Sequence, residues 1–363
     1  MTVLVTGAAG LIGSHVTDVL VERGDRPRVL VRPGESLEVL PTAVVDIHRG
    51  DVADRGVLEA ALRNVDCVLH CAARTGPWGS WPEYERTNVR GLEVLVRTAV
   101  ATGVRRIVHV SSIVVHGTDV GGTADETAPL REEPNPYSRS KVAGERLAEH
   151  LIREHGAPVT IVRPGWVYGP RDTASFGRVV AAIARGRMIM LGSGENHLPL
   201  IYVRDVAQGI VLASEREQSA GHSYLLVNDE PVTQREFICA IASELGVPSP
   251  KLRIPYRLAL AAGAAAEAAG HLAHLEQPPP LTRFGVRLLG GENRFSIARA
   301  RHDLGFVPSV NLGEGVHRGV DWYRATLAGS PRHGTQTKPT DAGPRLIDEG
   351  APSRGGVNAK AER

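Results

Sequence analysis

Tyr137 and Lys141 are four positions apart in the run Tyr137-Ser138-Arg139-Ser140-Lys141, and Ser112 follows an apolar run upstream of them. On a helix, side chains at this spacing share one face. A phenol titrates near pH ~10, so it exchanges protons poorly at neutral pH, but a nearby ammonium group favours the phenolate and lowers the pKa. The Ser112 hydroxyl can polarise a substrate oxygen. The three side chains therefore predict proton transfer at a carbonyl or alcohol oxygen.

A glycine-rich turn stands near the start of the chain, in Thr6-Gly7-Ala8-Ala9-Gly10-Leu11-Ile12-Gly13. It follows a short apolar run and opens an amphipathic one, which predicts a strand, a tight turn and a helix. Gly7, Gly10 and Gly13 allow the turn, a close approach of the backbone to a pyrophosphate, and close packing of helix on sheet. The helix N-terminus, including Leu11 and Ile12, offers N–H groups to the phosphates. The turn predicts a dinucleotide site.

Together the two motifs predict hydride transfer to or from a nicotinamide, whose positive charge also favours the Tyr137 phenolate. In ketone reduction Tyr137 donates the proton, and in alcohol oxidation it accepts one. A Tyr and a Lys four positions apart occur often by chance. The prediction depends on the glycine-rich turn upstream and on Ser112 between the two motifs.

Further cofactor contacts are predicted where the next strands end. Arg32 stands where an acidic residue would bind the ribose of NAD, and an arginine there pairs with the 2′-phosphate of NADP. NADP(H) is therefore favoured, and NAD(H) is the alternative if Arg32 is a solvated loop residue. Asp51, followed by Val52, can accept a hydrogen bond from the adenine amine. Ala72 and Ala73 are small enough for the cofactor to lie across the fourth strand.

The elements that position these residues alternate short Val/Ile/Leu runs with amphipathic stretches, which predicts an α/β fold with a doubly wound parallel sheet. Strands are predicted at residues 2–6, 28–31, 44–49, 67–70, 107–111 and 160–162, and helices at 12–23, 83–102 and 138–155. The expected organisation is a dinucleotide-binding domain over residues 1–165 and a mixed region over 166–327. That region returns to the sheet and forms a smaller cap. Order is expected to end near Tyr323, with a disordered tail over 328–363.

Composition narrows the function classes. The 363 residues are 42% hydrophobic and 23% charged with a formal net charge of +2, which indicates a globular protein and gives no field that suggests nucleic acid or an anionic membrane as partner. Cys67, Cys71 and Cys239 have no disulfide or metal-ligand spacing, so no metal site is predicted. A reducing cytoplasm is expected, and the chain opens without a signal peptide pattern. The Ala-rich residues 258–275 are too short for a membrane span and predict an amphipathic or buried helix.

With these motifs in place, the chain resembles the extended short-chain dehydrogenase/reductase superfamily over about residues 1–325. The resemblance implies a Rossmann-type domain, catalytic roles for Ser112, Tyr137 and Lys141, cofactor contacts from Arg163-Pro164, and a C-terminal cap that binds substrate. It also implies that Asn88 orders the region around the active site. A homodimer is expected by the same analogy, formed through a helix pair that includes the helix bearing Tyr137.

One branch of the superfamily is similar in two further stretches. They are Ala73-Arg74-Thr75-Gly76-Pro77-Trp78-Gly79, followed by Tyr84 and Asn88, and Leu281-Thr282-Arg283-Phe284 with Phe295-Ser296-Ile297-Ala298-Arg299-Ala300 and Leu304-Gly305-Phe306. Both resemble 3β-hydroxysteroid dehydrogenases, sterol-4-carboxylate 3-dehydrogenases and 2-alkyl-3-oxoalkanoate reductases. This branch implies a small, apolar substrate with a 3-hydroxy or 3-oxo group, steroid-like or oxoacyl.

Departures from the superfamily pattern bear on the substrate. Sugar dehydratases carry an Asp-Glu pair where this chain has Ile113 and Val114, and nucleotide-sugar enzymes tend to place an arginine where this chain has Leu198. An apolar substrate fits these changes better. Trp78 and Trp166 are further candidates for substrate contact, although either can be an ordinary packing residue. The alternatives are a nucleotide-sugar 4-epimerase, with no net redox change, and a non-catalytic cofactor-binding regulator.

Overall fold

A seven-stranded parallel sheet forms the centre of the N-terminal half in the computed structural model, which describes residues 1–329. Its strand order is β12-β7-β5-β4-β1-β2-β3, so the order reverses direction between β1 and β4. The strands are β1 (Val3–Thr6), β2 (Arg28–Val31), β3 (Asp46–Arg49), β4 (Cys67–His70), β5 (Arg106–Val110), β7 (Val159–Pro164) and β12 (Ser223–Leu226). The expected Rossmann-type, doubly wound α/β fold is confirmed.

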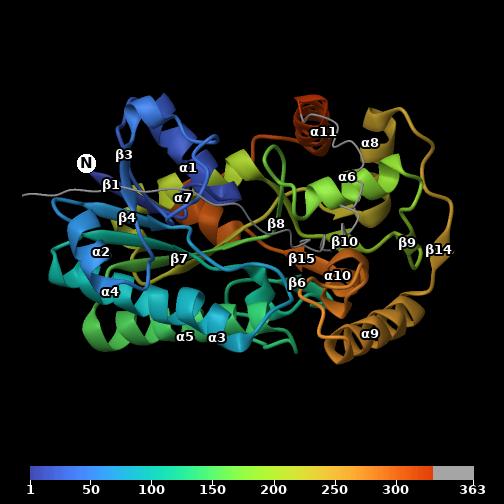
Figure 1. Cartoon of the computed structure of the whole chain (residues 1–363), viewed down its shortest axis with the longest axis horizontal. Helices are drawn as coiled ribbons and strands as arrows, with labels where there is room; N and C mark the ends of the chain where they lie inside the picture. The colour runs from blue at the N-terminus through green and yellow to red at the C-terminus, as the bar shows by residue number, and fades with distance from the viewer. Residues whose placement is uncertain (330–363) are drawn as a thin grey trace, which may run out of the picture.

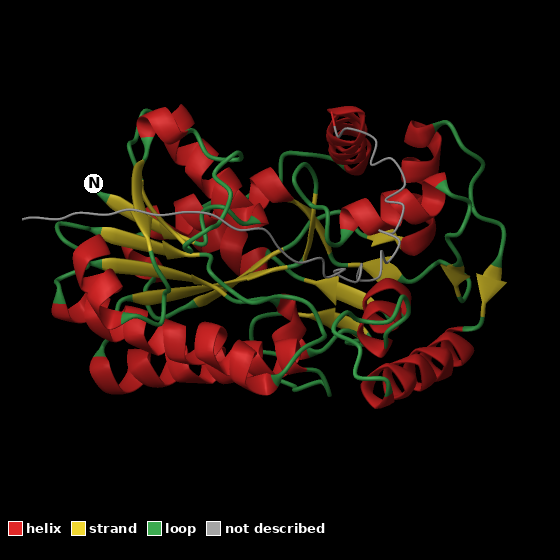
Figure 2. Ribbon diagram, viewed as in Figure 1, coloured by secondary structure: helices red, strands yellow, loops and turns green. Residues whose placement is uncertain are grey.

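Helices cover both faces of this sheet, as Figures 1 and 2 show. On one face α1 (Leu11–Glu22) packs beside α7 (Val203–Glu215), and their apolar residues join the central strands in one core. On the other face lie α2 (Arg55–Ala61), α4 (Gly91–Ala101) and α5 (Pro136–His155), with a second core between them and the sheet. Because both faces are covered, the strands are apolar without alternation, as the sequence predicts.

The second half of the chain forms the cap on the right of Figure 1 and also contributes α7 and β12 to the sheet. One cap core joins α6 (Phe176–Ala184), α8 (Gln234–Leu245) and α11 (Leu312–Gly329), and a smaller one joins α9 (Tyr256–Leu272) to α10 (Arg283–Gly290). Short strand pairs complete the cap and its junction: β8 (Trp166–Tyr168) with β11 (Leu200–Tyr202), β9 (Met190–Leu191) with β14 (Arg253–Ile254), β10 (His197–Leu198) with β13 (Val232–Thr233), and β6 (Gly122–Ala124) with β15 (Asn293–Phe295).

Several predicted element bounds differ from the observed ones. The third strand begins at Asp46, because residues Thr42–Val44 form a 3-10 turn before it. The single helix predicted over residues 83–102 is α3 (Trp81–Tyr84), a π-helical turn over Glu85–Arg90, and α4. Helix α11 continues to Gly329, past Tyr323. The rest of the predicted disordered tail, residues 330–363, lies outside the described residues.

Residues 258–275 were expected to form an amphipathic or buried helix rather than a membrane span. They overlap α9, and between residues 1 and 329 no helix is long and apolar enough to cross a bilayer.

Candidate active site

Helix α5 carries Tyr137 in its first turn and Lys141 one turn later. The helix begins sharply because Asn135 caps it: the Asn135 Oδ1 accepts the Ser138 N–H at 2.8 Å, and Pro136 occupies the first turn. The predicted helix and the shared face of the two side chains are therefore present. The helix N-terminus lies against the carboxyl edge of the sheet, where β5 ends.

Lys141 is held at that edge by the backbone of β5. Its Nζ donates a hydrogen bond to the Val110 carbonyl at 2.9 Å, and the residue is 5% exposed. Burial lowers the pKa of Lys141 to about 8, since removal from water disfavours the ammonium form, while the negative charge of Glu145 acts in the opposite direction. Lys141 is thus a cation close to its titration point at neutral pH.

Ser112 and Tyr137 meet at the end of β5. Ser112 caps a 3-10 turn over Ile113–His116, with its Oγ accepting the Val114 N–H at 3.3 Å. Burial raises the pKa of Tyr137, and a hydrogen bond with Ser112 acts in the opposite direction. The sequence predicts a lowered pKa for this phenol, but in the structure the pKa of Tyr137 is raised. The desolvation of Tyr137 dominates, and Lys141 is not among the groups that shift its pKa.

A buried acid that sequence reasoning missed lies one helical turn beyond Lys141. Glu145 accepts a hydrogen bond from the Ser111 hydroxyl at 2.5 Å and from Arg163 Nε at 2.8 Å. Arg163 also donates to the Glu126 carbonyl at 2.9 Å. The guanidinium of Arg163 is therefore turned into the protein. The sequence signal that could have found this pair is the spacing, since a Glu four positions after Lys141 shares the same helix face.

Asn88 lies inside the π-helical turn Glu85–Arg90 and is 5% exposed. Its Nδ2 donates to the Arg74 carbonyl at 2.9 Å and to Ser140 Oγ at 2.8 Å, and its Oδ1 accepts the Arg74 N–H at 2.7 Å. One side chain thus ties the segment after β4 to α5, between Tyr137 and Lys141. These bonds satisfy the polar groups of Asn88 and hold the interrupted helix in place.

The glycine-rich turn leaves no space for side chains. Gly7 has φ +65°, and a Cβ on it would lie 2.6 Å from the Ala72 Cα, while a Cβ on Gly13 would lie 2.2 Å from the Gly7 carbonyl oxygen. Gly10 donates its N–H to the Gly7 carbonyl at 3.0 Å, and α1 begins at Leu11. The first N–H groups of α1, including Ile12, have no acceptor within the helix. This bare, positively polarised helix end fits a dinucleotide pyrophosphate.

The predicted ribose and adenine contacts lie at the ends of β2 and β3. The Arg32 side chain is 75% exposed and its Nη2 pairs with Glu35 Oε1 at 3.1 Å. Asp51 pairs through Oδ2 with Arg86 Nη2 at 2.6 Å and accepts the Ala53 N–H at 2.9 Å. The remaining predicted contacts are placed by the strand ends: Val52 is buried after β3, Ala72 and Ala73 follow β4, and Pro164 ends β7.

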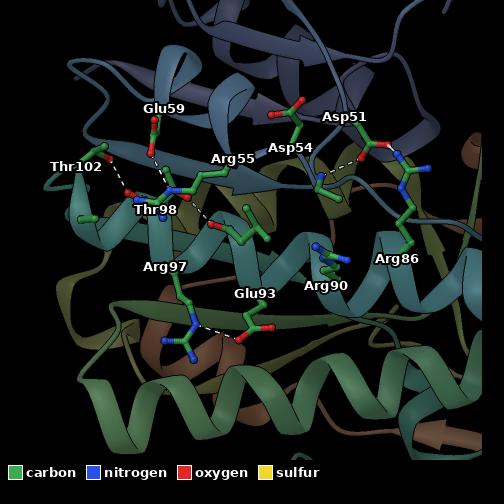
Figure 3. A pocket seen from close by; sticks show the side chains of 13 residues that line it. Asp51, Asp54, Arg55, Glu59, Arg86, Arg90, Glu93, Arg97, Thr98 and Thr102 are labelled. Carbon is green, nitrogen blue, oxygen red and sulfur yellow. Dashed lines mark hydrogen bonds and ion pairs between the residues drawn. The ribbon is translucent and has the colours of Figure 1, made fainter.

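A cavity of about 870 Å³ opens beside Asp51, between α2 and α4 (Figure 3). Its lining is charged, but the charges compensate: Arg55 pairs with Glu59, Arg97 with Glu93, and Arg86 with Asp51. Neither the glycine-rich turn nor the catalytic side chains line it. It lies beside the predicted adenine end of the cofactor site.

The cap meets the catalytic helix through Phe284, which the sequence analysis did not name as a site residue. The Phe284 ring lies edge-on to the Tyr137 ring, with centroids 6.3 Å apart. Trp78 bridges the same two halves: its Nε1 donates to the Leu275 carbonyl at 2.9 Å, and its ring stacks on His271 at 4.1 Å. Phe284 thus contacts the start of α5, and Trp78 contacts the end of α9; we refer to these two residues as the aromatic roof.

The other two predicted substrate residues pack within the cap. Trp166 donates its Nε1 to Ser175 Oγ at 2.5 Å and lies edge-on to Phe237. Leu198 is 4% exposed and belongs to the same apolar core. The structure therefore brings Trp78, but neither Trp166 nor Leu198, into the roof. Substrate contact by any of them remains a prediction.

Comparison with known proteins was decisive for the family. Residues 3–226 match the family model described as the NAD dependent epimerase/dehydratase family. The chain belongs to this family. Membership of the extended short-chain dehydrogenase/reductase superfamily is thereby confirmed, and so is the expectation of an NAD(P)-dependent dehydrogenase/reductase.

Two curated members of the family are named for redox reactions. A 2-alkyl-3-oxoalkanoate reductase of Stenotrophomonas maltophilia is 31% identical over 328 residues, which cover 88% of this chain and 98% of the relative. A 3β-hydroxysteroid dehydrogenase/Δ5→4-isomerase of Mycobacterium tuberculosis is 28% identical over 339 residues, covering 88% and 90%.

Solved structures of the family agree in fold. The crystal structure of gox2253 has a TM-score of 0.76 and 30% identity, covering 90% of this chain and 98% of its own. The dTDP-glucose 4,6-dehydratase DesIV of Streptomyces venezuelae, solved with NAD, has a TM-score of 0.73 and 26% identity, covering 90% and 98%.

Proposed function

We propose that the chain interconverts a secondary alcohol and a ketone by hydride transfer, acting on the 3-hydroxy or 3-oxo group of an apolar, steroid-like or oxoacyl substrate. The observation that carries the proposal is the Phe284 ring set edge-on to Tyr137. An aromatic side chain beside the catalytic phenol favours a hydrocarbon skeleton over a sugar. The redox names of the relatives from Stenotrophomonas maltophilia and Mycobacterium tuberculosis support the same class.

In ketone reduction, the substrate oxygen lies between the Ser112 and Tyr137 hydroxyls. Ser112 donates a hydrogen bond that polarises the carbonyl, and Tyr137 donates its proton as negative charge develops on the oxygen. Lys141 lies one turn along the same helix and is the cation that would favour the resulting phenolate. A nicotinamide cofactor held at the glycine-rich turn would supply the hydride, and with the proton from Tyr137 the ketone would become an alcohol. Oxidation runs these transfers in reverse.

The residues of the glycine-rich turn hold the cofactor in this proposal. The N–H groups of Leu11, Ile12 and Gly13 receive the pyrophosphate, and Ala72 and Ala73 leave space along β4. We favour NADP(H) over NAD(H), because the exposed Arg32 guanidinium is available to a 2′-phosphate once it leaves Glu35.

We also propose a homodimer built on a helix pair that includes α5. Helices α4 and α5 lie side by side on one face of the molecule (Figure 1), and Val100 of α4 is exposed there. Light scattering of the purified protein should give twice the mass of the chain, and a monomer at micromolar concentration contradicts this proposal.

The deciding experiment is the net change in nicotinamide absorbance with purified protein. NADP and NAD in both redox states are offered with 3-hydroxysteroids, 3-oxosteroids, 3-oxoacyl compounds and nucleotide sugars. Net turnover with a steroid or oxoacyl compound is expected. Conversion of a nucleotide sugar to its epimer without net absorbance change supports the 4-epimerase instead. Cofactor binding without turnover of any compound supports a regulator.

A further inference from the structure

Helix α9 presents an apolar stripe to solvent. A surface helix normally turns its apolar face inward and its polar face outward. Seven exposed positions of α9 recur at helical spacing and are apolar: Leu258, Ala261, Ala262, Ala265, Ala268, Ala269 and Leu272. The other exposed positions of the helix are Arg257 and His271. We refer to these seven residues as the α9 stripe. Helical spacing alone predicts one apolar face, and here the tertiary structure leaves that face uncovered.

Large exposed hydrophobic side chains concentrate around this helix. Leu258 is 60% exposed and Leu272 is 84% exposed. Leu252, Leu275 and Leu281, which flank the two ends of α9 in sequence, are exposed as well. Across residues 1–326 the other exposed large hydrophobic residues are Met1, Val44, Val100 and Val307, which are far apart in the chain. Such a concentration marks an interaction surface rather than ordinary solvent exposure.

Unpaired cations stand at the N-terminal end of the same helix. Lys251, Arg253 and Arg257 are exposed, and none has an ion pair or side-chain hydrogen bond with any residue that the structure describes. The acid on α9 itself, Glu267, is engaged by Arg283, whose Nε donates to Glu267 Oε2 at 2.6 Å. Glu276, beyond the helix, is exposed. The surface charge around the stripe is therefore positive.

The helix that bears the stripe also packs against the segment that contacts Tyr137. Gly263 packs closely on the backbone of Thr282 and Arg283, at the start of α10, and this places Phe284 against Tyr137. Near the other end of α9, Gly270 packs on the Trp78 ring. Gly263 and Gly270 are buried against these contacts, whereas the α9 stripe is exposed to solvent. Helix α9 itself lies at the edge of the molecule in Figure 1.

We propose that the α9 stripe docks on a lipid bilayer that contains anionic headgroups. Exposed leucines enter the interface between headgroups and acyl chains, and adjacent cations pair with the anionic headgroups. Because α9 is too short and too weakly apolar to span, the attachment is peripheral. The net charge of +2 gave no sign of this, since it averages a local positive cluster with acids elsewhere.

The docking has a functional consequence that rests on the proposed function. An apolar substrate concentrates in the bilayer, and a cap lying on that surface holds the aromatic roof at the reservoir. Substrate then reaches Tyr137 without crossing water. The docking itself does not depend on turnover, so it can be tested separately.

The test is flotation of the full chain with vesicles of phosphatidylcholine alone and of phosphatidylcholine with phosphatidylglycerol. Binding is expected with the anionic vesicles and weakens as salt rises. The double variant Leu258→Glu/Leu272→Glu should reduce the bound fraction by about tenfold or more, and Lys251→Ala/Arg253→Ala/Arg257→Ala should reduce binding to the anionic vesicles alone. Val307→Glu changes an equally exposed hydrophobic residue outside α9 and should bind like the unmodified chain.

Two controls keep the outcomes separate. Thermal unfolding checks that the variants are folded, and turnover of a short, water-soluble ketone should be unchanged in Leu258→Glu/Leu272→Glu. Absence of binding to anionic vesicles overturns the proposal even if turnover is normal. A loss of dimer mass in the Leu258→Glu/Leu272→Glu variant, without vesicle binding by the unmodified chain, shows that a second copy covers the stripe. Vesicle binding without turnover leaves the docking intact and contradicts the proposed function.

Discussion

Glu145 and Arg163 form an ion pair that solvent does not reach, with side chains 0% and 3% exposed. The pair joins the catalytic helix to the end of β7, and the Ser111 bond to Glu145 adds the end of β5. Three segments that carry Ser112, Lys141 and Pro164 are therefore fixed by one carboxylate. Lys141 lies one turn from that carboxylate on α5, and the Glu145 charge keeps its pKa from falling further.

Glu145→Gln should lower the free energy of unfolding by about 3–5 kcal/mol, because it leaves the Arg163 guanidinium buried without its counter-charge. Urea unfolding measures the change. The matched control is Glu132→Gln, whose partner Arg146 is 58% exposed in a surface pair, and it should change stability by ~0–1 kcal/mol. Equal effects of the two substitutions contradict a structural role for the buried pair.

Tyr137→Phe should reduce turnover by about 10²–10⁴-fold, since it removes the phenol that transfers the proton. Cofactor affinity should change little, because the glycine-rich turn holds the pyrophosphate. Steady-state kinetics and titration of cofactor fluorescence measure the two effects. Tyr224→Phe is the control. The Tyr224 hydroxyl, on β12, donates to Asp303 Oδ2 at 3.2 Å, and its loss should leave turnover near normal. Full activity of Tyr137→Phe refutes the mechanism.

Lys141 should make stability depend on pH between about 8, its folded pKa, and 10.5, its unperturbed value. In that window the unfolded chain binds the proton that the folded chain lacks, so the free energy of unfolding rises with pH. Below pH 8 both states are protonated, and burying the charge costs about 3 kcal/mol.

Lys141→Met removes this titration along with activity. Its stability relative to the unmodified chain should therefore be most favourable at pH 7 and should decline by about 3 kcal/mol by pH 10.5. Urea unfolding at several pH values measures the difference, and groups that titrate in both proteins cancel. A difference that does not vary with pH shows that Lys141 is not perturbed.

Gly13→Ala should weaken cofactor binding by about tenfold or more, because the new Cβ would lie 2.2 Å from the Gly7 carbonyl and push α1 away from the turn. Calorimetric titration with NAD and NADP measures it. Gly24→Ala is the control: Gly24 has φ +87° with nothing within 4 Å, so alanine strains the backbone there without touching the cofactor turn. If Gly13→Ala binds the cofactor as tightly as the unmodified chain, the pyrophosphate does not bind at the glycine-rich turn.

Arg32→Ala should reduce NADP affinity by about tenfold and leave NAD affinity nearly unchanged, since a 2′-phosphate loses its cation. Glu35→Gln should act in the opposite sense, because it releases the Arg32 guanidinium from its 3.1 Å pair. The ratio of the two dissociation constants is the measurement. If the protein prefers NAD and neither substitution changes that preference, Arg32 does not belong to the cofactor site.

Local pattern determined much of the fold and part of the site. Apolar runs predicted β2 and β4 at their observed bounds, and helical spacing predicted that Tyr137 and Lys141 share a face. The turn between β1 and α1 followed from glycine spacing. Each of these features depends on residues within a few positions of one another, so the period of the backbone is enough to specify it. The π-helical turn over Glu85–Arg90 was not predicted, because Asn88 holds it through hydrogen bonds to Arg74 and Ser140, which are distant in sequence.

Only the tertiary structure decided which distant segments meet. It brought Phe284 to Tyr137, Trp78 to His271 and Arg163 to Glu145, and it turned Leu198 into the cap core. It also left the apolar face of α9 exposed, although the same spacing fits a helix packed inward. Periodicity specifies that a face exists, but what covers it depends on the packing of elements far apart in the chain. The hydrophobic effect is non-directional, so it does not specify which partner covers an apolar face.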